Sequence, residues 1–365
     1  SPVGNNLYDQ GRWNDYNNKV ASLGATDWNQ VTDTDWQDQI YRMGFSQNHQ
    51  FSLTGGNDRT KFIFSGDVNT IQGIVKSSGF KRFSGRAMIN SKVKKWLSFN
   101  TNNTYGYTQN DGITQASGAA GASGVFIKAL RYSPLNSRTS SDFGDDNTDG
   151  DLVTNPLILL NDAYNKRISK RFNTNNTFTF SLAKGLTLKS MLGGTFTEVK
   201  HSMFYPQSTG QGMNTKGTAR IGNISMCDLI NENTLNYSAK FAKRHKIDAM
   251  VGASFNVSHR EYAEANAQGF YYEDLGVNNI GAGTTLVSPF SNKSQSQMAS
   301  FMGRVNYNYK ERYLLTASLR ADGSSKFGDN KWGYFPSTAF AWRLSEEPFI
   351  TVSYTHLRAH ETKAN

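Results

Sequence analysis

The sequence predicts an all-β protein: an antiparallel transmembrane β-barrel, of which about eleven strands are present. Three observations predict it. Apolar and polar residues alternate over segments of roughly 10–18 residues, which is long against the usual five or six residues of a strand. The connections between these segments alternate between tight and long. Aromatic residues gather beside the tight connections.

Residues 312–328 show the alternation most clearly. Every second residue from Tyr313 to Ala321 is apolar, whereas the residues between them, Leu314 excepted, are polar or charged. Because successive side chains of a strand point to opposite faces, this segment has one apolar and one polar face. We expect the apolar face to contact lipid and the polar face to line a lumen. The same pattern recurs in residues 171–182, 246–258, 300–309 and 333–344.

The connections follow in a regular order along the chain. Tight connections are predicted at residues 55–60, 91–95, 183–186, 243–246, 309–312 and 345–348. Longer connections, rich in Gly, Asn and Asp, are predicted between them at residues 71–78, 109–167, 205–216, 262–297 and 322–333. In an up-and-down sheet, alternate connections lie at the same end. The tight turns therefore share one end and the long loops the other, as in outer-membrane barrels.

Aromatic residues favour the same architecture. The aromatic side chains beside the tight turns are Trp96, Phe241, Tyr307, Tyr309 and Tyr313. A ring of aromatic side chains is typical of the level at which a barrel meets the membrane surface. A soluble β-sandwich is the alternative, but it rarely needs strands of this length.

Composition excludes several classes of protein. The chain has 365 residues with 13% aromatic and only 19% charged residues, and its single cysteine, Cys227, allows no internal disulfide. No apolar run approaches the ~18 residues of a transmembrane helix. The net charge is +10, but Lys and Arg recur singly along the chain rather than in one basic stripe. Nucleic-acid binding is therefore not expected.

The long connection at 109–167 contains two features of its own. Residues 117–136 have a Gly-rich start and then apolar residues at helical spacing, which predicts a short helix that ends near Pro134. Asp145, Asn147 and Asp149 match the first half of a calcium-binding loop, but Pro156 stands where the bidentate Glu is required. A solvated acidic turn is the alternative to a loop calcium site, and no other cofactor is expected.

The sequence contains no recognisable catalytic constellation. His356 and His360 have the spacing of a zinc-protease motif but lack the Glu that should follow His356, and there is no Gly-x-Ser-x-Gly segment. The chain is therefore not expected to be an enzyme.

Several long segments resemble the SusC/RagA-type TonB-dependent (TonB-linked) outer membrane transporters of Bacteroidetes. The segments that carry the resemblance are residues 34–97, 129–136, 154–167 and 304–349. The resemblance implies a barrel of about 22 strands with a plugged lumen. It assigns residues 1–30 to a linker after the plug domain, which is absent from this sequence, and residues 31–349 to the N-terminal half of the barrel. Residues 350–365 resemble translated sequencing-adapter sequence and are expected to be non-native.

The resemblance also implies a function and partners. It implies TonB-dependent uptake of a large nutrient across the outer membrane, usually an oligosaccharide and sometimes a peptide. It implies a SusD-like lipoprotein as lid, and coupling to the TonB–ExbB–ExbD complex through the missing N-terminal region. Two alternatives stay open: a surface adhesin or ligand-binding β-protein without transport, and an outer-membrane barrel enzyme.

Candidate ligand-binding residues were sought in the long loops. A sugar presents apolar CH faces and many hydroxyl groups, so aromatic platforms beside amide side chains suit it. The candidates are the aromatic residues Tyr205, Phe270, Tyr271, Tyr272 and Trp332 and the amide residues Asn278 and Asn279.

Overall fold

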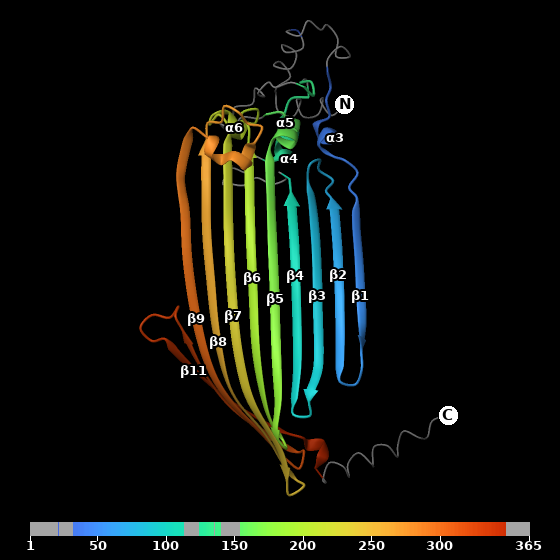
Figure 1. Ribbon diagram of the computed structural model, residues 1–365, viewed down its shortest axis with the longest axis vertical. Coiled ribbons are helices and arrows are strands. Elements are labelled where there is room, and N and C mark those ends of the chain that lie inside the picture. The colour runs from blue at the N-terminus through green and yellow to red at the C-terminus, as the bar shows by residue number, and fades with distance from the viewer. Residues whose placement is uncertain (1–20, 22–31, 113–123, 135, 140–153, 348–365) are drawn as a thin grey trace, which may run out of the picture.

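The computed structural model describes residues 21, 32–112, 124–134, 136–139 and 154–347. They form one 11-stranded antiparallel sheet in which each strand pairs with the next along the chain (Figure 1). The strands are β1 (Ser46–Gly56), β2 (Thr60–Gln72), β3 (Gly79–Lys94), β4 (Leu97–Asp111), β5 (Tyr164–Ala183), β6 (Leu186–Tyr205), β7 (Thr218–Phe241), β8 (His245–Gln268), β9 (Thr285–Tyr309), β10 (Tyr313–Ser324) and β11 (Trp332–Trp342). The predicted partial barrel sheet is confirmed.

Several strands are longer than their sequence pattern predicts. β7 and β8 each have 24 residues and β9 has 25. Toward the long loops the apolar face carries polar residues at several positions, such as Glu261 of β8 and Gln295 and Gln297 of β9, so the two-residue period weakens in the sequence. The backbone ladder continues there, with pairs as far as Ala267 and Leu286, because cross-strand hydrogen bonds do not depend on which side chains are apolar.

The alternation of tight and long connections is also confirmed. The tight turns lie at the lower end of the sheet in Figure 1, here called the tight-turn end, and the longer loops at the opposite loop end. Gly185 shows how tight the turns are: its φ is +76°, and a Cβ there would lie 2.2 Å from the carbonyl oxygen of Ser238. Only glycine fits such a position.

The two faces of the sheet differ as the alternation predicts. On one face, here called the apolar face, Phe172 pairs with Phe196, and Phe180 with Leu188. Large side chains of this face are open to the surroundings; Val251, for example, is 58% exposed and Leu319 is 53% exposed. In a soluble sandwich such a face would be covered by a second sheet. An uncovered apolar face of this extent is typical of a surface that meets lipid.

A row of aromatic rings follows the apolar face near the tight-turn end. His245 stacks on Phe241 with ring centroids 5.1 Å apart, and Tyr313 lies between Tyr309 at 6.2 Å and Trp342 at 6.1 Å. Trp96 stacks on Phe180 at 6.2 Å further along the sheet. These rings occupy the place predicted for the aromatic girdle.

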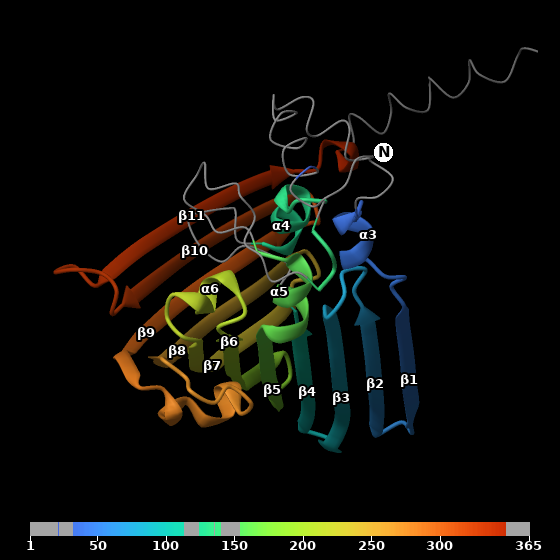
Figure 2. The ribbon, with the colours of Figure 1, turned by 90° about the horizontal axis from the view of Figure 1, so that it is seen from above.

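The sheet is curved, and its polar face is the inner side. From above, the strands follow an arc from β1 to β11, and α4 (Val125–Arg131), α5 (Pro156–Asp162) and α6 (Gly210–Met213) lie inside it (Figure 2). The short helix η2 (Gly276–Ala282) lies outside the arc. Two neighbouring residues of β6 support the assignment of the polar face to the inner side. Tyr205, on the polar face, packs against the cluster of α4 and α5, and Phe204, on the apolar face, packs with residues of η2.

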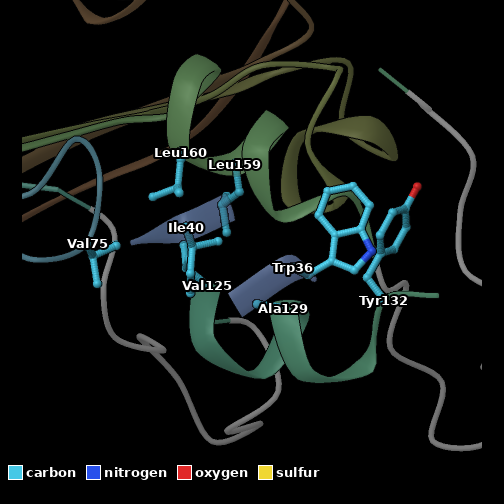
Figure 3. Packing of buried hydrophobic residues seen from close by; sticks show 8 residues of the cluster. All are labelled: Trp36, Ile40, Val75, Val125, Ala129, Tyr132, Leu159 and Leu160. Atoms are coloured by element: carbon cyan, nitrogen blue, oxygen red, sulfur yellow. The ribbon is translucent and has the colours of Figure 1, made fainter. Parts of the chain in front are cut away.

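Three short helices build a small hydrophobic core at the loop end, here called the loop-end cluster (Figure 3). The third helix, α3 (Trp36–Ile40), begins at Asp35, whose side chain accepts hydrogen bonds from the amides of Gln37 and Asp38. α5 begins after Asn155 in the same way. The predicted helix before Pro134 is confirmed as α4. The buried members of the cluster are Trp36, Ile40, Val75, Val125, Ala129, Tyr132, Leu159 and Leu160.

None of these helices is long and apolar enough to span a membrane, in the part of the chain that the structure describes. The cluster instead joins segments that are far apart in sequence. The amide of Thr34 donates to the carbonyl of Pro134 at 2.9 Å, and Trp36 Nε1 donates to the carbonyl of Ser133 at 2.9 Å. The Trp36 ring also meets Tyr132 edge to face, with centroids 4.9 Å apart.

Replacing Trp36 by alanine should loosen this cluster without unfolding the sheet. The indole is 2% exposed and donates a hydrogen bond to the Ser133 carbonyl, so its loss leaves a cavity and removes that bond, at a cost of about 3–5 kcal/mol. We expect amide hydrogen exchange in α4 and α5 of the complete barrel to accelerate by at least about tenfold, while β6 stays protected. Phe126→Ala, at a 37% exposed position of α4, is the matched control. Unchanged exchange in W36A would contradict a packed cluster.

Candidate functional site

The inner wall of the arc carries polar side chains that bond to one another across strands. Arg82 and Asp67 form an ion pair at 2.9 Å, with the Asp67 carboxylate 15% exposed. On β10, Arg320 Nε donates to Asp322 at 2.8 Å. Such pairs hold charges of the wall in place. Other charged residues of the wall lie beside hydroxyl and amide groups: Arg86 donates to Asn102 at 2.9 Å and Arg171 to Asn173 at 3.1 Å. This wall suits the passage of a polar solute.

A denser group of polar side chains lies where the wall meets the long loops, here called the mouth cluster. It consists of Asn165, His201, Arg220, Tyr262, Glu264 and Asn266. Arg220 pairs with Glu264, and Tyr262 donates its hydroxyl hydrogen to the same carboxylate. The Asn266 amide also donates to Glu264, at 2.7 Å, so three neighbours hold this carboxylate.

The register of β6, β7 and β8 brings these residues together. Gly222 of β7 pairs with His201 on one side and with Glu264 on the other. Because Gly222 has no side chain, the Tyr262 ring can lie over it, and a Cβ at Gly222 would meet the Tyr262 hydroxyl at 3.5 Å. His201 Nε2 lies 2.8 Å from Asn165 Oδ1. The cluster therefore forms a continuous polar patch on the inner wall.

The chemistry of the mouth cluster is that of binding. It offers guanidinium, amide, imidazole and hydroxyl groups beside the face of one aromatic ring, and such groups hydrogen-bond hydroxyl-bearing or amide-bearing solutes. Among the described residues, no group of three or more His, Cys, Asp or Glu is placed to hold a metal ion. The calcium candidates Asp145, Asn147 and Asp149 lie outside the described residues.

The aromatic residues predicted from the loops do not form one site. Tyr205 lies on the inner side, where it packs against the loop-end cluster. Tyr271 and Tyr272 are 82% and 86% exposed, in the loop that leads to η2. Asn278 and Asn279 are exposed on η2 itself, which lies outside the arc. Tyr205 and the two asparagines of η2 therefore lie on opposite sides of the wall.

The rings of two predicted residues, Phe270 and Trp332, pack on other aromatic rings. Phe270 is only 2% exposed because its ring packs edge to face on Phe204, with centroids 5.4 Å apart, so it is a packing residue rather than an open platform. Trp332 stacks on Phe301 of the apolar face at 5.9 Å. Its pairing with Gly323 places it on the apolar face rather than on the inner wall.

The mouth cluster lies at strand ends rather than in the loops from which the candidate residues come, although the sequence carries a signal for it. In residues 260–266 (REYAEAN), polar residues stand at every second position and alanines at two of the three positions between them. The partner residues His201 and Arg220 come from other strands and could be found only through the register.

Comparisons with known proteins agree with this geometry. Residues 96–356 match the model of the family described as TonB dependent receptor-like, beta-barrel. The TonB-dependent receptor P39 of Formosa agariphila is 31% identical over 350 residues, covering 91% of this chain and 33% of the relative. The TonB-dependent receptor SusC of Bacteroides thetaiotaomicron is 28% identical, covering 88% of this chain and 33% of the relative.

One solved structure also matches the fold. The RagAB peptide transporter superposes with a TM-score of 0.73 at 21% identity, over 87% of this chain and 36% of that chain. The chain thus spans about a third of the length of the curated relatives it matches.

Proposed function

This chain belongs to the TonB-dependent receptor-like β-barrel family of the outer membrane, and on that premise we propose that its protein imports an oligosaccharide across that membrane. The barrel segment would supply part of the wall of the transport path. Energy would come from TonB–ExbB–ExbD through a segment outside this chain. No bond is broken in the proposed reaction, because the cargo only changes sides.

The observation that carries the proposal is the polar inner wall with the mouth cluster at its loop end. The hydrogen-bonding groups there are mostly neutral, and the carboxylate of Glu264 is already engaged by Arg220, Tyr262 and Asn266. Neutral donors and acceptors suit the hydroxyl groups of a sugar. A peptide is the competing cargo, since the structural neighbour RagAB is a peptide transporter.

A SusD-like lipoprotein is the proposed lid. The loop-end cluster supports it, because a packed helical platform at the mouth offers a defined surface to a partner. Leu130 of α4 is 54% exposed and Phe126 is 37% exposed, although both neighbour the buried core. An adhesin would also bind a partner at this end, so the transport assay below has to separate the two functions.

Uptake of labelled oligosaccharides and peptides of matched size would test the proposal. Cells that carry the complete gene should accumulate one or more glycans, and the accumulation should stop when the proton gradient is collapsed or TonB is removed. Glycan binding without accumulation would favour an adhesin. Accumulation of peptides alone would replace the proposed cargo and keep the transport.

Removing the side chain of Tyr262 should weaken capture of the cargo. Tyr262→Ala takes away an aromatic face and a hydroxyl group from the mouth cluster, and one lost hydrogen bond to a ligand costs about 1 kcal/mol. We expect the half-saturating cargo concentration to rise about five- to tenfold with an unchanged amount of barrel in the membrane. Tyr271→Ala, at an 82% exposed position of the loop that leads to η2, is the control. Equal effects of the two variants would exclude the mouth cluster.

A further inference from the structure

The fold gathers basic residues at the tight-turn end, although they are scattered in the sequence. Turn residues 57–61, 91–96, 183–186, 240–246, 309–313 and 343–347 contain 13 Lys or Arg and four Asp or Glu. The whole chain has a formal net charge of +10, so these turns carry almost all of it. We call them the basic rim. Its basic members are Arg59, Lys61, Lys92, Lys94, Lys95, Lys184, Lys240, Lys243, Arg244, Lys246, Lys310, Arg312 and Arg343.

The few acidic groups of the rim do not cancel this charge. The carboxylate of Glu347 is bound by three neighbours. Tyr313 donates its hydroxyl hydrogen to it at 2.7 Å, Trp342 Nε1 donates at 3.1 Å, and Arg312 forms an ion pair with it at 3.1 Å. Lys95, Lys184 and Arg244, by contrast, are exposed at three successive tight turns. The rim therefore presents a row of positive charges to its surroundings.

The rim lies next to exposed apolar anchors. Trp96, beside Lys95, is 53% exposed; Leu182, beside Lys184, is 54% exposed; and Phe241, close to Arg244, is 47% exposed. Lys310 Nζ lies 5.2 Å from the centre of the Tyr309 ring, which belongs to the aromatic row of the apolar face. Basic side chains directly beside interfacial aromatic and aliphatic groups are the pattern of a surface that meets phosphate headgroups.

Two lysines of the rim occupy backbone positions that favour other residues. Lys243 and Lys310 have φ angles of +56° and +54°, in the left-handed region where Gly or Asn is the usual choice in a tight hairpin. The neighbouring residues Ala242 and Glu311 share this geometry, with φ angles of +45° and +59°, so it belongs to the turns and places Lys243 and Lys310 within them.

We propose that the basic rim binds the phosphate groups of acidic phospholipids in the membrane leaflet at the tight-turn end. The apolar anchors enter the acyl region and the Lys and Arg side chains extend to the headgroups above it. The lipid is favoured over a soluble acidic partner because the charges continue directly into the surface that contacts lipid. The contact fixes the height of the barrel in the membrane at this end.

Lipid retention by the complete barrel would test the proposal. The complete transporter, purified in detergent, is incubated with micelles containing phosphatidylglycerol or phosphatidylcholine, and bound lipids are counted by native mass spectrometry. The test variant is Lys95→Gln/Lys184→Gln/Arg244→Gln. Because a basic residue at an acidic lipid surface contributes a factor of about five, we expect retained phosphatidylglycerol to fall at least about fivefold. Phosphatidylcholine retention should not change.

The matched control removes three charges at the loop end: Lys216→Gln/Lys326→Gln/Lys331→Gln. It should retain phosphatidylglycerol like the unaltered protein, and both triple variants should keep the unaltered unfolding temperature in detergent. An excess of glycerol 3-phosphate should not displace the lipid. Equal retention by all three proteins, equal losses in both variants, or displacement by glycerol 3-phosphate would each overturn the proposal.

Discussion

An arginine at Val251 should destabilise the complete barrel by about 2–4 kcal/mol, because it would place a charge in the middle of the lipid-facing surface. Val251 is 58% exposed on the apolar face, between Leu235 of β7 and Gly303 of β9. It lies six residues, or about 20 Å, from the tight-turn end of β8 and further from the loop end, so the guanidinium cannot reach water easily. Unfolding in urea from phospholipid vesicles measures the loss.

Ser254→Arg is the matched control three residues along the same strand. Ser254 lies on the polar face, opposite Glu232 of β7 and Ser300 of β9. An arginine there enters the hydrated lumen beside a carboxylate, and we expect its effect to stay within about 1 kcal/mol. If both variants cost the same, or if Ser254→Arg costs more, the assignment of the faces is reversed.

The fold could be predicted from the sequence because its determinants are local. The period of two in residues 312–328 assigns each side chain to a face, and that assignment needs no partner strand. Tight connections such as that around Gly185 then determine which strands are neighbours. The far ends of β7 to β9 escaped prediction because their alternation fades while the hydrogen-bond ladder continues.

The candidate site was predicted less well because it depends on register. Phe270 is expected to be open from the sequence, but Phe204, more than 30 positions away, packs on its ring, while Trp332 stacks on Phe301 of the apolar face and stays 45% exposed there. The mouth cluster requires His201, Arg220 and Glu264 to meet across three strands. The basic rim was missed for the same reason, since its charges are separate in sequence and meet only when every second turn comes to one end.

The chain by itself, expressed in buffer without detergent, should form large aggregates rather than a monomer. In the described part of the chain, β1 pairs only with β2 and β11 only with β10, so two edges keep unpaired backbone groups. Both edge strands are exposed along their whole length except at Gly333, and Phe51 and Phe340 are 68% and 67% exposed. The unpaired edges and the exposed apolar face together favour association between copies of the chain.

Size-exclusion chromatography with light scattering would measure the mass of the aggregates. Detergent should reduce this mass, because it covers the apolar face. Detergent cannot pair the edges, so cooperative thermal unfolding should return only when the remaining strands of the barrel are supplied. The matched control is therefore the complete barrel in the same detergent. A monodisperse monomer of residues 1–349 that unfolds cooperatively without detergent would contradict two claims. The exposed apolar face would then not need lipid, and the open edges would not need further strands, since neither would be costly in water.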